Sequence, residues 1–421
     1  MIPALPAELV DIVIDHLFDD KPSLRACALV SSTWLPTSRY HLFRSITVFI
    51  KQGMLFADFL NFLRATHLGL LVRDLTLSGV KATRYRQDRL SHPLLLHILD
   101  RLPFLRSFRL RQVSFYQNPE SWSPEDRLRL RMGPTSLSLD RLQFEYIGRP
   151  AEVGSETSAW EVFGVCSSFK SFRTLHLSDL DFRTGSRPWL HPQLPCIVRP
   201  TVLRIDNCVA LRILVKNLAR YQVLSSVEEL HLVSEDYRPV GKILQEAGTR
   251  LRRLTLDMGT LETLRHYIFF VNPGEHLLNL VDLAHCTSLV DLTLRLHVVR
   301  TIHSITTVGM PWEPFRAFLP RLSPTIQNVT VDIRSGPLLG AQRFLHDTEI
   351  ERWSGIEDRV DRLVNLKTLN FDFHHVPDAK PSLHMTPETF ATQLEHILVH
   401  KLPRLKALRK LSFSNVVILD S

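Results

Sequence analysis

The residues best spaced for chemistry lie near the end of the chain, where two histidines could share a metal ion. His396 and His400 stand four positions apart in a segment of helical character, so both would project from one helix face. Glu395 and His384 lie nearby in the sequence and could extend a ligand set. Because no cysteine or second acidic pair supports them, a histidine pair on a helix beneath a repeat is the simpler interpretation. We predict no metal site and no cofactor.

Two other groups are candidates for acid–base chemistry. Asp179 and Asp181 are paired carboxylates at the end of a predicted strand, but no matching partner accompanies them in the sequence. His374 and His375 follow another predicted strand and are expected to begin a polar loop. The chain lacks glycine-rich phosphate loops, a G-x-S-x-G nucleophile turn and an H-E-x-x-H zinc motif. The sequence therefore predicts a protein without catalytic activity of its own.

Basic residues occur in short clusters, which raises the question of nucleic-acid binding. The clusters are Lys81, Arg84, Arg86 and Arg89; Arg106, Arg109 and Arg111; Arg127, Arg129 and Arg131; and Arg250, Arg252 and Arg253. A nucleic-acid site would need them to converge on one face with aromatic residues between them. They fall at different phases of different sequence repeats, so solvated surfaces are favoured over a nucleic-acid site.

Composition indicates a folded protein of the cell interior. Of the 421 residues, 44% are hydrophobic, and the net charge is +8, a modest basic excess for this length. The five cysteines are scattered, odd in number and without a C-x-x-C pair, which favours reduced thiols in the cytoplasm or nucleus. Glu8, Asp11 and Asp15 stand where a signal peptide would be basic and then apolar. No apolar stretch approaches the ~20 residues of a membrane span.

Most of the chain carries a degenerate repeat of the form L-x-x-L-x-L, at spacings of 24 to 42 residues. The clearest copies are at 72–77, 105–110, 172–177, 227–232, 251–256, 289–294, 366–371 and 408–413. Weaker copies centre on Ile46/Val48, Leu142/Phe144, Leu203/Ile205 and Val329/Val331, which brings the total to twelve. Each copy predicts a strand with one buried face, because apolar and polar residues alternate.

Apolar helical stretches precede several of these strands, for example at 54–67 and 92–102. A strand–helix unit cannot bury its apolar face alone, so such units stack into a solenoid. The pattern resembles leucine-rich repeats, although the units are longer than usual and mostly lack the Asn or Cys after the strand. The fold class expected is α/β, with an irregular leucine-rich-repeat-like horseshoe; a generic α/β domain with leucine-rich strands is the alternative.

Segments rich in Pro, Gly and Ser are expected to form the loops between repeats. They are 118–134, 148–158, 184–200, 309–324, 336–340 and 376–387.

The polar positions of the strands would line the concave face of such a solenoid and bind a protein ligand. Arginines dominate the earlier half, whereas Asp257, Asp332 and Asp372 join the later half. The candidates for substrate contact are Arg109, Arg111, His176, Arg204 and His231. We hypothesise that an acidic or phosphorylated segment binds the earlier half by bidentate arginine contacts. An ordinary solvated ladder of side chains is the alternative for each residue.

The first 45 residues form a separate pattern of three short helices. Glu8 complements the start of the first helix, and apolar residues then recur at helical spacing. Asp20 and Pro22 are suited to begin the second helix. Ser31 and Ser32 are expected to break the chain and cap the third helix, which would carry Trp34, before a strand over 43–48.

So small a module cannot bury all of its apolar side chains, so some should remain exposed for a partner. The run Leu5-Pro6-Ala7-Glu8-Leu9, the helix around 24–30 and the following Trp34 resemble the F-box family. The segment departs from the common pattern at 31–33, where many members carry a Cys or a basic residue. We predict an F-box over 1–45 and a leucine-rich-repeat-like substrate-recognition domain over 46–421.

The resemblance implies a substrate receptor of a Skp–cullin–F-box ubiquitin ligase. Its contacts with the Skp adaptor would come from Leu5, Pro6, Leu9, Ile12, Val30 and Trp34. The repeat domain would bind the protein that is to be ubiquitinated, and cullin and its RING partner would be reached through the adaptor. Two alternatives stay open: an F-box scaffold that does not direct degradation, and a hydrolase or nucleic-acid binder whose N-terminus only mimics an F-box.

Overall fold

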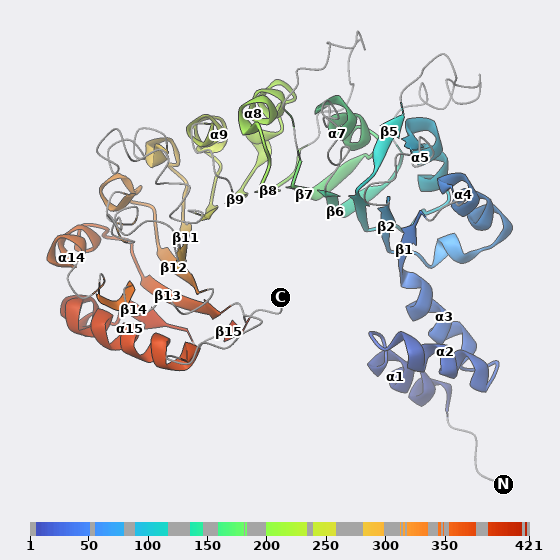
Figure 1. Cartoon of the computed structure of the whole chain (residues 1–421), viewed down its shortest axis with the longest axis horizontal. Helices are drawn as coiled ribbons and strands as arrows, with labels where there is room; N and C mark the ends of the chain where they lie inside the picture. Colours follow the sequence, from blue (N-terminus) through green and yellow to red (C-terminus); the bar gives the residue numbers. More distant parts are fainter. Residues whose placement is uncertain are drawn as a thin grey trace, which may run out of the picture. The chain divides into compact units, whose positions relative to one another are not determined.

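Figure 1 shows the computed structural model of the chain, which is an α/β protein built on parallel strands. The structure describes residues 6–50, 55–79, 89–116, 135–145, 159–180, 182, 199–233, 239–257, 281–298, 312, 315, 318–335, 344–346, 348, 353–375, 386–414 and 417–418. The chain divides into two compact units, Met1–Val198 and Arg199–Ser421. The predicted boundary at residue 45 lies inside the first unit and stays a prediction.

The first unit begins with three helices, in the residues where three short helices are expected. They are α1 (Ala7–His16), α2 (Lys21–Val30) and α3 (Leu35–Arg44). Asp20 caps α2, because its side chain accepts a hydrogen bond from the Ser23 backbone N–H at 3.2 Å. Ser31 and Ser32 do not cap α3 as expected: Trp34 holds the N-cap position without a side-chain bond, and Ser31 Oγ instead lies 2.7 Å from Thr33 Oγ1.

The strands of the first unit form a parallel sheet in the order β1-β2-β4-β6-β7. Their bounds are β1 (Ser45–Phe49), β2 (Asp74–Ser78), β4 (Ser107–Arg111), β6 (Ser138–Glu145) and β7 (Ser171–Ser178). A separate parallel pair, β3 (Arg89–Ser91) and β5 (Ser114–Tyr116), was not expected from the sequence. The helices between the strands are α4 (Phe56–Ala65), η1 (Leu68–Leu70), α5 (His92–Leu99) and α7 (Ala159–Cys166).

The second unit repeats this design, with parallel strands in the order β8-β9-β10-β11-β12-β13-β14 and β15 paired to β13. The strands are β8 (Val202–Asp206), β9 (Glu229–Val233), β10 (Arg253–Asp257), β11 (Asp291–Val298), β12 (Asn328–Ser335), β13 (Thr368–His375), β14 (Leu411–Phe413) and β15 (Val417–Ile418). The intervening helices are α8 (Leu211–Arg220), η3 (Leu224–Ser226), α9 (Val240–Ala247), η4 (Leu283–His285), η5 (Leu319–Arg321), α14 (Trp353–Asp361), α15 (Pro387–Lys401) and α16 (Pro403–Ala407).

The alternation of the repeats explains these strands. Each of the twelve predicted copies overlaps a strand, and the strands pair in parallel register, for example Leu75 with Phe108 and Leu77 with Leu110. These apolar side chains are buried, whereas the polar positions between them lie on the other face of the strands. The predicted helices at 54–67 and 92–102 also form, as α4 and α5, and bury their leucine and phenylalanine faces.

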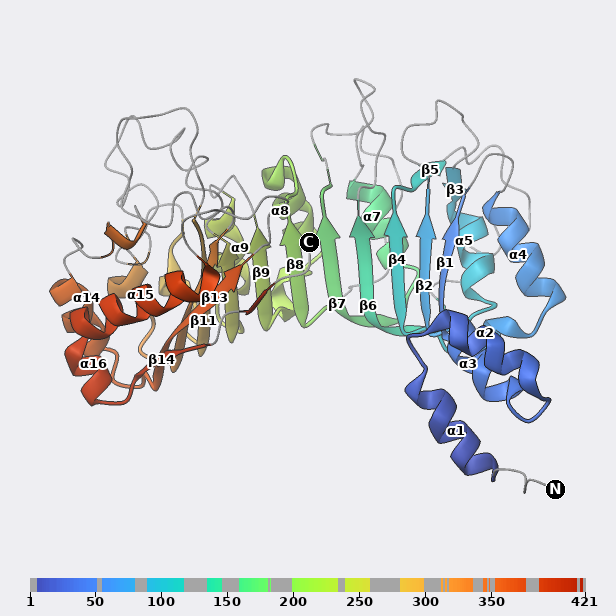
Figure 2. The same cartoon turned by 60° about the horizontal axis from the view of Figure 1, so that its bottom comes forward.

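Helices lie along one side of the strands in each unit (Figure 2), and this is the side of the buried apolar residues. In α8, for instance, the buried residues Leu211, Leu214, Val215 and Leu218 recur at helical spacing. The polar side of the strands carries no helix in the described part of either unit. The polar residues of neighbouring strands therefore lie side by side on this face.

Two expectations about loops differ from the structure. His374 and His375 do not begin a loop, because β13 continues through both residues in register with Arg334 and Ser335 of β12. The segment 309–324, expected to be an inter-repeat loop, contributes Trp312, which is fully buried. Most of the other predicted loop residues lie outside the described part of the chain.

An aromatic cluster around Trp312 forms part of the core of the second unit. The ring of Trp312 lies 4.8 Å from Trp353, 5.5 Å from Phe344 and 6.1 Å from Phe371, measured between centroids. Trp312 Nε1 donates to Thr348 Oγ1 at 2.9 Å, and Trp353 Nε1 donates to the Thr348 carbonyl at 2.7 Å. Both indole N–H groups thus have partners, so the tryptophans are buried without an unsatisfied donor.

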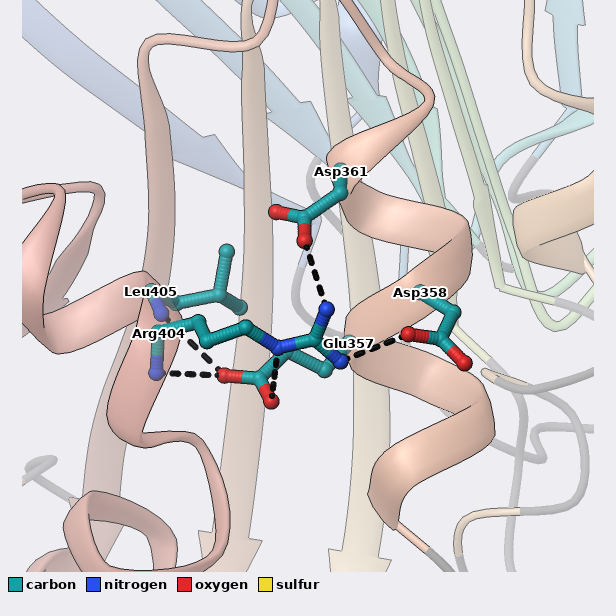
Figure 3. A network of polar contacts seen from close by, with 5 residues as sticks. All are labelled: Glu357, Asp358, Asp361, Arg404 and Leu405. Atoms are coloured by element: carbon teal, nitrogen blue, oxygen red, sulfur yellow. Dashed lines mark hydrogen bonds and ion pairs between the residues drawn. The ribbon is translucent and has the colours of Figure 1, made fainter.

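The end of the second unit is held by a network of polar contacts between α14 and α16 (Figure 3). The carboxylate of Glu357 accepts hydrogen bonds from the backbone N–H groups of Arg404 and Leu405, at 2.7 and 3.2 Å, and from Arg404 Nε at 3.0 Å. The Arg404 guanidinium also reaches Asp358 at 2.6 Å and Asp361 at 3.3 Å. One buried carboxylate thus caps α16 and anchors its arginine.

Close approach between successive repeats explains the glycine in η1. A Cβ on Gly69 would lie 2.2 Å from the carbonyl oxygen of Arg101, which cannot move without shifting the next turn. We expect Gly69→Ala to lower the free energy of unfolding of the first unit by about 1–3 kcal/mol. Gly355 is the matched control, because it is exposed on α14 with no atom within 4 Å of its Cβ position. Gly355→Ala should leave stability unchanged or raise it by up to about 1 kcal/mol. Hydrogen exchange of β2 and α14 would measure both effects.

Candidate functional site

The first candidate surface is on α1, whose polar side faces the rest of the protein. Asp11 Oδ1 accepts a hydrogen bond from Thr37 Oγ1 of α3 at 2.5 Å. Asp15 Oδ1 lies 2.7 Å from Nε2 of His41, also on α3, and the His41 side chain is only 7% exposed. The two aspartates are one helical turn apart, so together they hold α1 along α3. The two aspartates of α1 therefore bond within the module, at its surface, where Asp15 is 61% exposed.

The apolar side chains of α1 divide between two faces. Val10 and Ile14 are buried and form a small core with Leu24 of α2. Leu9, Ile12 and Val13 are instead 47%, 52% and 43% exposed. We call these three residues the apolar face of α1. An aliphatic stripe directed to solvent, on a helix whose aspartates are bonded to α3, is the pattern of a surface that binds a partner.

The other residues predicted to bind an adaptor differ from one another. Pro6 is exposed at the start of α1, and Val30 is 64% exposed at the end of α2. Trp34 is half-buried and packs against the core of Val10, Ile14 and Leu24, so it also supports the module from within. Leu5 lies outside the described residues.

The prediction missed further exposed apolar side chains of the helical module. Phe18 is 54% exposed and Leu29 is 87% exposed, and Val13 completes the stripe begun by Leu9. Val13 could have been found from its spacing of four residues from Leu9. The burial of Leu24 and Cys27 fixes which face of α2 is outside, and the exposure of Leu29 follows from that packing.

The second candidate surface is the polar face of the strands, considered in each unit separately. In the first unit, Thr76, Arg109, Gln143 and His176 lie side by side in register on β2, β4, β6 and β7. Arg109 Nε donates to Gln143 Oε1 at 3.0 Å, and Arg111 Nε lies 3.1 Å from Glu145 Oε1. Both arginines proposed to bind an acidic ligand therefore already have partners in their own sheet. Gln143 is itself buried.

In the second unit, Arg204 of β8 lies opposite His231 of β9. Both oxygens of Glu229 are occupied: Oε1 lies 2.7 Å from His231 Nε2, and Oε2 lies 2.8 Å from Arg253 Nη2. Burial alone would raise the pKa of Glu229, but the His231 hydrogen bond and the charges of Arg253 and Arg204 outweigh it and lower that pKa. Burial lowers the pKa of His231, and the charges of Arg204 and Arg295 lower it further against the pull of Glu229.

A second charged cluster surrounds Asp332, which is 4% exposed. Its carboxylate lies 2.9 Å from Arg295 Nε, 3.3 Å from Arg334 Nε and 2.6 Å from His374 Nδ1. These residues come from β11, β12 and β13, so the cluster joins neighbouring strands. His374 thus has a role inside the sheet that its expected place in a loop would not allow.

The residues considered for chemistry do not assemble into a site in the described part of the chain. His396 and His400 are exposed on α15, whereas His384 and Asp181 lie outside the described residues. Among the described residues, no group of three or more potential metal ligands lies together. Burial and the nearby Asp282 raise the pKa of the Cys286 thiol to about 12, so it stays protonated and unreactive. No described helix has the length and hydropathy to cross a membrane.

Comparison with known proteins adds no relative: no protein-family model and no curated protein matches this chain. The function must therefore be inferred from the two surfaces. The apolar face of α1 is suited to bury aliphatic side chains against another protein. The polar face of the strands offers hydrogen-bonding and charged side chains over neighbouring parallel strands. Both arrangements are typical of protein recognition.

Proposed function

We propose that this protein is the substrate-recognition subunit of a Skp–cullin–F-box ubiquitin ligase. The supporting observation is the apolar face of α1: Leu9, Ile12 and Val13 are exposed while Asp11 and Asp15 are bonded to α3. The run at 5–9 that resembles the F-box family leads into this same helix. In this proposal residues 1–45 are the F-box and bind the Skp adaptor, with a total buried area of about 1,200–2,000 Å².

The remaining residues form the substrate-binding domain in this proposal, stacked as an irregular leucine-rich-repeat-like solenoid. Parallel strands that alternate with helices, each strand with one buried and one polar face, support this arrangement. α3 ends at Arg44 and β1 begins at Ser45, without a linker between them. The Arg73 backbone N–H also donates to the Arg44 carbonyl at 2.8 Å, which ties the end of α3 to the turn before β2.

The protein performs no chemistry itself in this role. It holds a target protein near the ubiquitin-loaded enzyme, and the reaction is accelerated by proximity. A short, bonded junction between adaptor-binding helices and substrate-binding strands suits that task, because a flexible junction would dilute the effective concentration of the target. Buried thiols at the four described cysteines agree with a place in the cytoplasm or nucleus.

Co-purification of the full chain with the Skp adaptor tests the proposal. The wild type is compared with a Leu9→Asp/Ile12→Asp double variant, which places two carboxylates on the apolar face of α1. We expect a stable complex with the wild type and none with the variant. Absence of a complex with either protein, or equal recovery with both, would overturn the assignment. If the complex forms but deletion of the protein changes no partner's half-life, the non-degradative scaffold is the better description.

A further inference from the structure

On the polar face of the second unit, residues that are in register on neighbouring strands form rows across the sheet. The rows differ in how many hydrogen bonds and ion pairs their side chains make. One row contains Glu229, Arg253, Asp291, Asn328 and Thr368. Its members bond along the row: Arg253 to Glu229 at 2.8 Å, Asn328 Nδ2 to Asp291 Oδ1 at 2.6 Å, and Thr368 Oγ1 to Asn328 Oδ1 at 2.9 Å. This row needs no external ligand.

The row two residues further along the strands is also bonded internally. Arg295 lies 2.9 Å from Asp332, which additionally binds Arg334 and His374. Asp372 of this row accepts a hydrogen bond from Asn370 Nδ2, and Asn370 lies in register with Thr330 of the preceding row. Asp257, in register with Arg295, is 3% exposed. The charged groups here are thus buried or bound to their own neighbours.

The row between these two is different. We call its part on β8 to β12 the central row: Arg204, His231, Thr255, Thr293 and Thr330, of which Thr255 is only 9% exposed. The same register continues to Asn370 of β13, which is bonded to Asp372 and Ser412 and is not part of the central row. Within the described residues, the three threonine hydroxyls make no hydrogen bond. The Arg204 Nε–H is buried and has no acceptor there either. A buried N–H without an acceptor is unfavourable, so this end of the row is incomplete without a hydrogen-bond acceptor.

The dimensions of the central row match an extended peptide. Adjacent strands lie ~4.8 Å apart, so β8 to β12 spans about 19 Å. An extended chain advances ~3.3 Å per residue, so about six residues cover that length. Three hydroxyls that both donate and accept hydrogen bonds could meet the backbone of such a segment. Figure 2 shows β8 and β9 next to each other at the start of this path, with no helix over their polar face.

We propose that the central row binds an extended segment of a target protein, with a carboxylate of that segment on Arg204. This inference rests on the proposed function and deepens it, because it names the class of target and the place where it binds. It is separate from the prediction of an acidic ligand on Arg109 and Arg111, whose Nε atoms are bonded to Gln143 and Glu145. Arg204 can bind a carboxylate through two parallel N–H···O bonds.

A carboxylate suits this place better than a phosphate. The carboxylates of Glu229 and Asp206 lie one row away from the central row. A phosphate brings about two negative charges at pH 7, whereas a carboxylate brings one. His231 does not compensate the second charge, because burial keeps it neutral near pH 7. The segment is therefore acidic by Asp, Glu or its own C-terminus rather than by phosphorylation.

A display library of random hexapeptides, selected on the full-length protein, tests this proposal. We expect enrichment of peptides with Asp, Glu or a free C-terminal carboxylate. A synthetic copy of an enriched peptide should bind at least tenfold more weakly to Arg204→Gln, and Thr293→Val should also weaken it. Arg253→Gln is the matched control, because Arg253 is bonded to Glu229 one row away, and it should change the affinity by less than about threefold. Amidated and phosphoserine versions of the peptide separate the sources of the negative charge.

Several outcomes would overturn the proposal: no acidic enrichment, equal binding to Arg204→Gln and wild type, equal losses in Arg204→Gln and Arg253→Gln, or tighter binding of the phosphoserine version. Thermal unfolding of Arg204→Gln should stay close to that of the wild type, since the Arg204 Nε–H has no hydrogen bond to lose and the charge of Arg204 is the smallest of the effects that lower the pKa of Glu229. Adaptor binding by Arg204→Gln should also equal that of the wild type. Failure of the peptide test with intact adaptor binding would therefore leave the proposed function standing.

Discussion

Leu9→Asp should weaken binding of the Skp adaptor by about 10³-fold, equivalent to about 4 kcal/mol, while α1 to α3 stay folded. Leu9 is 47% exposed, so the folded protein alone tolerates a polar side chain there. The new carboxylate even lies in the first turn of α1, where the helix dipole favours negative charge. In the complex it would be buried against apolar groups without a partner. Titration calorimetry with the purified adaptor measures the affinity.

Two isoleucines of the same helix provide the matched control for this prediction. Ile12 is 52% exposed, whereas Ile14 is fully buried in the module core. Ile12→Ala should weaken adaptor binding by about 10-fold or more and change stability by less than about 0.5 kcal/mol. Ile14→Ala should lower the stability of the module by about 2–4 kcal/mol, with normal affinity in the fraction that is folded.

Hydrogen exchange of α1 to α3 in the full chain separates the two effects. Ile14→Ala should accelerate exchange there, and Ile12→Ala should not. If Ile12→Ala destabilised the module as much as Ile14→Ala, the exposed face of α1 would be structural, and the adaptor would have to bind elsewhere.

The strands could be predicted from the sequence because their signal is local. In a copy such as Leu254-Thr255-Leu256, the alternation of apolar and polar residues both defines the strand and assigns its faces. The short pair β3 and β5 has no such pattern, and its pairing depends on two segments meeting in space. β13 extends through His374 because Asp332 on the next strand offers it a partner, which the sequence around His374 does not show.

The candidate sites could be predicted only in part, for a related reason. The stripe of Leu9 and Ile12 follows from helical spacing alone, so its place on α1 was predictable. Which arginines are available to a ligand was not, because that depends on strand register. Arg109 and Gln143 are 34 residues apart in the sequence, yet they are hydrogen-bonded. Arg204 looks equivalent to Arg109 in its repeat, but the register places it beside His231, which is bonded to Glu229 and not to Arg204.

Trp34 illustrates a third kind of limit. It was predicted at the adaptor surface, and the structure packs it, half-buried, against the core of the helical module. A large aromatic side chain between two short helices can pack against the core with one part of its surface and contact a partner with another. Helical spacing does not show how much of its surface is buried in each way. A Trp34→Ala variant would mix both effects, which is why Leu9 and Ile12 are the better test positions.

Glu357→Ala should lower the free energy of unfolding of the second unit by about 2–4 kcal/mol, because backbone donors lose their buried acceptor. Glu357 is 4% exposed, and its loss leaves the backbone N–H groups of Arg404 and Leu405 without their acceptor. Bonds to Asp358 and Glu357 raise the pKa of the Arg404 guanidinium, so it is charged at every pH used for the measurement.

Asp358→Ala is the matched control for Glu357→Ala. Asp358 binds the same guanidinium but is 57% exposed, so we expect a loss below about 1 kcal/mol. Hydrogen exchange of α16 and β14 should accelerate in Glu357→Ala and stay near the wild-type rate in Asp358→Ala. Equal effects of the two variants would mean that the charge of Arg404, and not the capping of α16 by a buried carboxylate, holds this end of the unit.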